Sequence, residues 1–162
     1  MRENLAKALL FTSALIFSTS IFFLWLGKEP FKTYFFLFAW WSFIGAADSW
    51  LYLRGGDSIL VANPVGFFVS LVPFSAFLWF VFEAFNLRLR NWHYAGAPEE
   101  IWLRWPGTFL AFGTVLPGIF LAANLLEYFG IFRKNEFSQF FAGGLSKTSF
   151  ALFTVLLGIE WK

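Results

Sequence analysis

Residues 82–96 place a carboxylate, amides and arginines directly after a long apolar segment. With 3.6 residues per turn, one helix face would carry four side chains, Trp79, Glu83, Asn86 and Arg90. Glu83 and Arg90 lie two turns apart, and Asn86 can bridge them because an amide both donates and accepts hydrogen bonds. A carboxylate held in this way could act as a general acid or a proton acceptor. The alternative is a buried helix–helix contact closed by a salt bridge to a neighbouring helix.

A second carboxylate, Asp48, stands inside another apolar segment. The same helix face would carry Trp41, Ile44, Gly45 and Tyr52. The small residue at position 45 would let another helix approach closely. We therefore expect Asp48 to form an ion pair with Arg88 or Arg90 across that contact. In the alternative, Asp48 and Glu83 converge in one dry site that suits acid–base chemistry, with Asp48 tuning Glu83.

Polar and aromatic side chains continue beyond the expected end of the helix that carries Glu83. The ligand-binding residues that we expect are Trp41, Trp79, Asn86, Arg90, Asn91, Trp92, His93 and Tyr94. His93, which is the one histidine in the chain, is expected to form hydrogen bonds at the interface. The alternative is a hard-metal site that joins His93 to Glu99 and Glu100. We assign no metal to the site, and the sequence identifies no cofactor.

The composition indicates that these groups belong to a membrane protein. Hydrophobic residues make up 59% of the chain and charged residues 14%, whereas a soluble domain is about half apolar and a quarter charged. A fold of 162 residues in water could not bury that much apolar surface, so lipid is the simpler solvent. The basic residues are dispersed and the net charge is only +2, which argues against a nucleic-acid partner. We expect membrane lipids as partners and, in an alternative, other membrane subunits.

The apolar segments predict an all-α fold, which is a single integral membrane bundle of four or five transmembrane helices over residues 1–162. The expected spans are 6–26, 34–53, 62–87, 107–129 and a short one near 145–160. Prolines inside the third and fourth spans predict kinks. With five spans the 12 basic residues divide evenly between the two sides, so the positive-inside rule gives no orientation.

Two further groups are expected at the membrane surface. Trp102 and Trp105 should lie in the loop before the fourth span, where their amphipathic rings favour headgroup depth. Asn124 and Glu127 lie one turn apart near the end of that span, and we expect interfacial solvation for this pair.

Three segments together resemble a family of uncharacterised bacterial polytopic membrane proteins. They are "FAWWSFIGAADSWLYLRGGDSIL" (38–60), "LWFVFEAFNLRLRNWHYAG" (78–96) and "GTVLPGIFLAANLLE" (113–127). The family pairs a Trp-rich span that holds an Asp with a later Phe-Glu-x-x-Asn-Leu-x-x-x-Asn-Trp-x-Tyr segment, and a Val-Leu-Pro span follows. The resemblance implies a topology and a candidate site, but no reaction.

A weaker similarity is to the membrane-embedded lycopene cyclase domain. That domain has an acidic residue near a span end, then a Trp-x-aromatic piece and a Pro-x-Glu-Glu motif. Here Glu83 precedes Trp92 and Tyr94, and "PEE" follows at residues 98–100 without the spacer residue. The similarity would imply protonation of a polyene by paired carboxylates.

Two functions are compatible with these patterns. In the first, the protein handles a small lipophilic ligand, lipid-like or isoprenoid-like, at a polar intramembrane site in a bacterial cytoplasmic membrane, with Glu83 as the acid or base. In the second, it is a non-catalytic accessory or structural subunit of a larger membrane complex. The sequence leaves open whether the protein is an enzyme.

Overall fold

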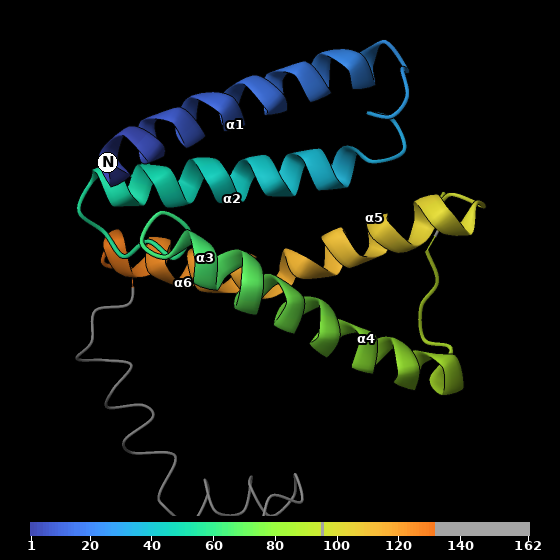
Figure 1. Ribbon diagram of the computed structural model, residues 1–162. Coiled ribbons are helices and arrows are strands. Elements are labelled where there is room, and N and C mark those ends of the chain that lie inside the picture. The colour runs from blue at the N-terminus through green and yellow to red at the C-terminus, as the bar shows by residue number, and fades with distance from the viewer. Residues whose placement is uncertain (95, 132–162) are drawn as a thin grey trace, which may run out of the picture. The chain divides into compact units, whose positions relative to one another are not determined.

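The computed structural model describes residues 1–94 and 96–131, and the expected short span near 145–160 lies outside them. All regular elements in these described residues are helical, which confirms the all-α class. In chain order they are α1 (Arg2–Trp25), α2 (Phe35–Leu53), α3 (Pro64–Gly66), the π-helical turn η1 (Phe67–Leu71), α4 (Val72–Leu89), α5 (Ile101–Gly113) and α6 (Val115–Tyr128) (Figure 1).

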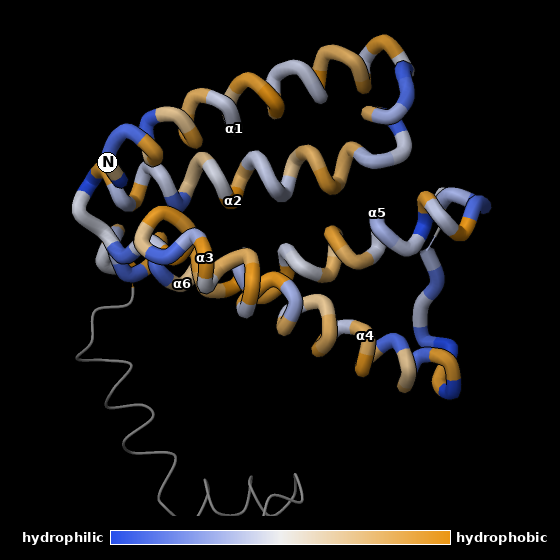
Figure 2. The backbone as a smooth tube through the Cα atoms, in the orientation of Figure 1, coloured by the Kyte–Doolittle hydropathy of each residue, from blue (hydrophilic) through white to orange (hydrophobic). Residues whose placement is uncertain are grey.

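Three helical stretches in the described part of the chain are long and apolar enough to cross a membrane: Arg2–Trp25, Pro64–Leu89 and Ile101–Tyr128. They correspond to the first, third and fourth expected spans and indicate an integral membrane protein. The second expected span forms the helix α2 but is not among the three, because its Trp, Ser and Asp residues make it less apolar. Figure 2 shows the hydrophilic residues gathered at helix ends and connections, with hydrophobic residues along the helices.

The helices α1 and α2 run antiparallel and pack through small side chains (Figure 1). The buried residues of α1 are Ala6, Ser13 and Ser20, which recur every seven positions. On α2, a side chain at Gly45 would collide with the Ser13 hydroxyl. The expected close helix approach at position 45 is therefore confirmed, and α1 is the helix that approaches.

The Asp48 side chain binds the loop that connects α2 to α3. Its carboxylate is fully buried and accepts hydrogen bonds from Ser58 Oγ at 2.7 Å, from the Ile59 amide at 2.6 Å and from the Val61 amide at 2.9 Å. The expected ion pair of Asp48 with Arg88 or Arg90 is therefore wrong. Backbone amides solvate the buried charge in place of a cation.

The same loop also forms a hydrogen bond with α6. Asn124 Nδ2 donates to the backbone carbonyl of Asp57 at 2.9 Å. The expected interfacial solvation of Asn124 is thus replaced by a contact across 67 residues of sequence. The core beside this loop contains Ile44, Leu51, Leu60, Phe67, Val72 and Leu121.

The prolines of the third span stand where the helix begins and where its type changes. Pro64 stands in the first turn, where Asn63 Oδ1 accepts from the Gly66 amide and caps the helix. Before Pro73 the chain widens into η1, in which the Val72 amide donates to the carbonyl of Phe67, five residues back. The wider turn accommodates a proline ring that cannot donate to the preceding turn and crowds it.

The fourth span begins earlier than expected and breaks at Thr114. Trp102 and Trp105 lie within α5, so their expected loop position is wrong. Pro117 cannot donate to the Gly113 carbonyl, which interrupts the helix between α5 and α6.

A hydroxyl from α4 fills this break. Ser75 Oγ donates to the Phe112 carbonyl at 2.6 Å and accepts from the Leu116 amide at 3.0 Å. These two backbone groups would pair with each other in a regular helix, so the Ser75 hydroxyl is inserted into one turn. This insertion fixes α4 against α5 and α6.

Candidate functional sites

Glu83 lies at the centre of a hydrogen-bonded group between the end of α4 and the loop that follows. Its Oε1 accepts from the indole Nε1 of Trp92 at 2.9 Å and also from the Tyr94 hydroxyl. The loop therefore turns back along α4, and the acidic residue of the sequence motif meets its Trp and Tyr. Glu83 Oε2 accepts no hydrogen bond from the described residues and is not buried.

Asn86 makes this return of the chain possible. Its Oδ1 accepts from the amides of Asn91 and Trp92 at 3.0 and 3.2 Å, and its Nδ2 donates to the Trp92 carbonyl at 2.9 Å. The expected bridge from Asn86 to Glu83 and Arg90 is wrong, because the amide binds backbone groups after the helix end. Asn suits this role because it can donate and accept at once.

Arg90 leaves the predicted helix face. The helix α4 ends at Leu89, and Arg90 has a left-handed backbone with φ of 53°. Its amide donates to the Asn86 carbonyl at 2.7 Å, which terminates the helix. The predicted stripe therefore contains Trp79, Glu83 and Asn86 but not Arg90.

Aromatic rings surround the Glu83 group. The Trp79 ring lies 5.5 Å from Phe82 and 6.1 Å from Phe112, measured between ring centroids. Trp79 lines a cavity of about 300 Å³ together with Phe82, Trp92 and Tyr94. Partial burial raises the pKa of the Tyr94 phenol above its usual range, and the hydrogen bond to Glu83 raises that pKa further. Tyr94 therefore stays a hydrogen-bond donor.

His93 is exposed and lies between the two donors to Glu83. No group of three or more His, Asp or Glu residues in residues 1–94 and 96–131 could hold a metal ion, so His93 does not join Glu99 and Glu100 in a metal site. Asn91 contributes its backbone amide to the turn.

The two predicted carboxylates are not brought together. Asp48 binds the loop at residues 58–61, whereas Glu83 binds residues 92–94. The carboxyl-terminal ends of α2 and α4, which carry them, lie at opposite ends of the view in Figure 1. Acid–base chemistry shared by the two groups is therefore not supported.

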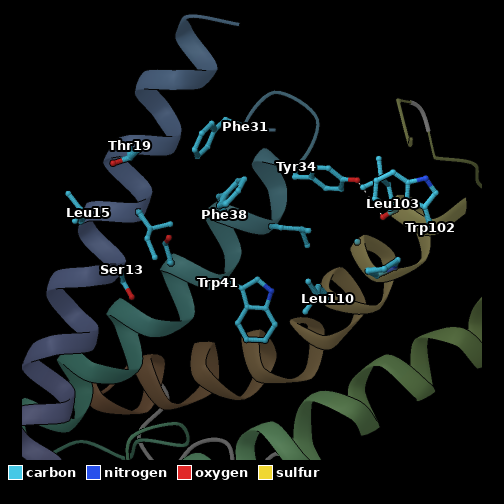
Figure 3. Close-up of a pocket in the computed structure, with 15 residues that line it drawn as sticks. Ser13, Leu15, Thr19, Phe31, Tyr34, Phe38, Trp41, Trp102, Leu103 and Leu110 are labelled. Carbon is cyan, nitrogen blue, oxygen red and sulfur yellow. Dashed lines mark hydrogen bonds between the residues drawn. The ribbon is translucent and has the colours of Figure 1, made fainter. Parts of the chain in front are cut away.

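Trp41 belongs to a separate and larger site. A groove of about 920 Å³ is walled by α1, α2, α5 and the connection before α2 (Figure 3). Most of its lining is apolar, including Leu15, Phe31, Phe38, Trp102, Leu103 and Leu110. Among residues 1–94 and 96–131, no Lys, Arg, Asp or Glu lines it. Tyr34 closes one part of the groove, where its hydroxyl contacts the Leu103 carbonyl at 3.4 Å.

Two residues that line this groove each carry a buried polar atom without a hydrogen-bond partner among residues 1–94 and 96–131, the indole Nε1 of Trp41 and the hydroxyl of Ser42. Ser42 as a whole is only 5% exposed, and neither polar atom is open to the water-sized space of the groove. Buried donors without partners are uncommon, since each costs about 1–3 kcal/mol. Two residues of the groove wall thus hold unused hydrogen-bonding capacity beneath the apolar surface that faces the open space.

Ser42 and Arg104 were not predicted as site residues. Ser42 is neither ionisable nor an amide, and a serine in a membrane helix usually donates to its own helix backbone. Its position beside Trp41, on a helix face of small residues, was the available signal. Arg104 was counted as a loop charge, but it lies in α5 and lines a cavity with Glu83.

Comparisons with protein-family models, with curated proteins and with solved structures find no match to this chain. The resemblances drawn from its motifs therefore remain predictions, and the two sites stand on their geometry.

Proposed function

We propose that this protein binds one neutral lipophilic molecule, lipid-like or isoprenoid-like, in the groove between α1, α2 and α5. The observation that carries the proposal is a pair of buried donors, Trp41 Nε1 and Ser42 Oγ, that belong to residues of an otherwise apolar wall and have no partner among the described residues. The volume of about 920 Å³ falls within the range of about 300–1,000 Å³ that small-molecule sites occupy.

The donors determine which molecule is selected. A molecule that leaves the bilayer for the groove exchanges one apolar environment for another, so its chain gains little from the transfer. Both donors turn toward the groove when a ligand enters, and a carbonyl, ether or hydroxyl oxygen that accepts from Trp41 and Ser42 then gains two hydrogen bonds in a dry site, each worth about 1 kcal/mol. Since no charged side chain lines the groove, a neutral polar group is favoured over a phosphate headgroup.

Binding, rather than catalysis, is the activity that this groove supports. Tyr34 is its one titratable lining residue, and Glu83 lies elsewhere, in a different cavity. A bacterial cytoplasmic membrane is the proposed location, because outer-membrane spans are β-barrels and the motifs resemble a bacterial family of helical proteins.

Native mass spectrometry of protein extracted gently from its own membranes tests the proposal. The expected result is a monomer or homo-oligomer that retains one small neutral lipophilic adduct. The double variant Trp41→Phe, Ser42→Ala should lose most of that adduct, because it removes both donors and keeps the apolar wall.

Ser49→Ala is the matched control. Ser49 is also on α2 and also has a buried, unpaired hydroxyl, but it does not line the groove, so the adduct should persist. Equal retention in all variants would overturn the proposal. Extraction within a defined larger assembly, without an adduct, would instead favour an accessory subunit.

A further inference from the structure

A second cavity, of about 330 Å³, carries two opposite charges on an apolar wall between α4 and α5. Glu83 lines it from α4 and Arg104 from α5, with Phe80, Trp105 and Phe112 among its other lining residues. It lies close to the end of α4 and the beginning of α5, a depth at which lipid headgroups meet helix ends.

The carboxylate is already held in place. Trp92 and Tyr94 both donate to Oε1 of Glu83, while Asn86 fixes the backbone that carries Trp92. Oε2 remains accessible and accepts no hydrogen bond from the described residues. A cationic donor that reaches Oε2 would meet a carboxylate that is already ordered, so binding costs little additional side-chain entropy.

The guanidinium of Arg104 is equally available. It has no hydrogen-bond or ion-pair partner in residues 1–94 and 96–131, where the one ion pair joins Glu3 to Lys7. Glu83 and Arg104 therefore line one cavity without contacting each other. Two groups of opposite formal charge that line one cavity unpaired suit a ligand that carries both signs, with its cation toward Glu83 and its anion toward Arg104.

We propose that this cavity binds a phosphoethanolamine group, with the ammonium donating to Glu83 Oε2 and the phosphate accepting from Arg104. The primary ammonium matters, because a quaternary ammonium has no N–H to donate to the carboxylate. A purely anionic headgroup would satisfy Arg104 alone and would meet Glu83 with the wrong sign. The cavity should therefore bind phosphatidylethanolamine more tightly than either phosphatidylcholine or phosphatidylglycerol.

Lipid titration of the purified, delipidated protein, followed by native mass spectrometry, tests the assignment. Phosphatidylethanolamine, phosphatidylcholine and phosphatidylglycerol with identical acyl chains are compared. The expected result is about tenfold tighter binding of phosphatidylethanolamine than of the other two, as one charge-assisted hydrogen bond provides. Equal binding of all three would overturn the assignment.

Single substitutions identify which residues produce the preference for phosphatidylethanolamine. Arg104→Gln removes no hydrogen bond from the fold, so it should fold normally and lose the preference for phosphatidylethanolamine. Glu83→Gln should also lose it, whereas Glu99→Gln and the groove variant Ser42→Ala should keep it. A preference that survives Arg104→Gln would overturn the assignment and would leave the proposal for the neutral-lipid groove untouched.

Free phosphoethanolamine added as a competitor identifies the source of the group. Displacement of phosphatidylethanolamine at millimolar competitor shows that the headgroup alone is recognised, so a soluble zwitterion is a second ligand. Persistence of the lipid under the same conditions shows that the acyl chains contribute and that the membrane supplies the ligand.

Discussion

Replacing Ser42 by alanine should make the lipid-free protein more stable and make it a poorer binder. Ser42 is buried and its hydroxyl has no partner in the part of the chain that the structure describes, so its removal relieves the cost of an unsatisfied buried group, about 1 kcal/mol. In the ligand-bound protein the same change removes one neutral hydrogen bond, which lowers affinity about fivefold. Stability and binding should therefore move in opposite directions.

Ser75→Ala provides the contrast. Ser75 is also buried, but its hydroxyl bonds to the Phe112 carbonyl and the Leu116 amide, and alanine would leave both backbone groups without this partner. We expect a loss of about 1–3 kcal/mol in the free energy of unfolding. Ser49→Ala should stabilise the lipid-free protein like Ser42→Ala, but it should not change binding, because Ser49 does not line the groove.

Denaturation in mixed micelles, followed by the fluorescence of the nine Trp residues, measures the stability of all three variants. Ligand retention after extraction from native membranes is measured in parallel. If Ser42→Ala destabilises the lipid-free protein as much as Ser75→Ala does, the Ser42 hydroxyl has a partner within the fold. The groove would then lack the free donor on which the proposed function depends.

Three further changes test the remaining geometry. Asp48→Asn should destabilise the protein by about 2–3 kcal/mol in the same denaturation assay, because an amide cannot accept all three loop hydrogen bonds. The control Asp57→Asn changes an exposed residue and should leave the free energy of unfolding nearly unchanged. Glu83→Gln should damage folding more than Glu99→Gln, as circular dichroism and yield will report; equal and mild effects would remove Glu83 from any special role. The Tyr94 phenol should ionise above its ordinary value near 10 in an absorbance titration of tyrosinate, and Glu83→Gln should lower its pKa without restoring that value, since burial is the larger cause. The raised pKa stabilises the fold below pH 10, and this contribution is lost as the pH rises through the folded-state pKa; no change in Glu83→Gln would contradict the hydrogen bond.

The sequence predicts well whatever depends on helix periodicity and composition. Long apolar segments can only be helices in lipid, so all three spans appear, the first and third close to their expected bounds and the fourth with an earlier start at Ile101. The small residue at Gly45 also marks a close helix contact, because only a residue without a side chain permits it.

Predictions failed where a side chain binds the backbone of a loop. Asp48 and Asn86 were both assigned partners on helices, yet both bind amides just beyond a helix end. Helix periodicity places a residue on a face but does not show how the chain returns after the helix stops. The left-handed Arg90 illustrates this, since nothing in its residue type indicates that the helix ends there.

Both sites also depend on tertiary packing between segments that are far apart in the sequence. Trp41 and Ser42 border a groove because α5, sixty residues later, packs beside α2, and Glu83 meets Arg104 across a cavity for a similar reason. No local spacing encodes these encounters.

Photo-crosslinking in native membranes tests the central claim, that a neutral lipid occupies the groove, most directly. A neutral diazirine-bearing lipid would be photolysed in the membrane and its adducts mapped by peptide sequencing. We predict saturable labelling of the half-buried Phe38 and Leu103, stronger than labelling of the exposed Phe22 and Phe74, and weaker in Ser42→Ala. Labelling that follows side-chain exposure alone and cannot be saturated would contradict the claim.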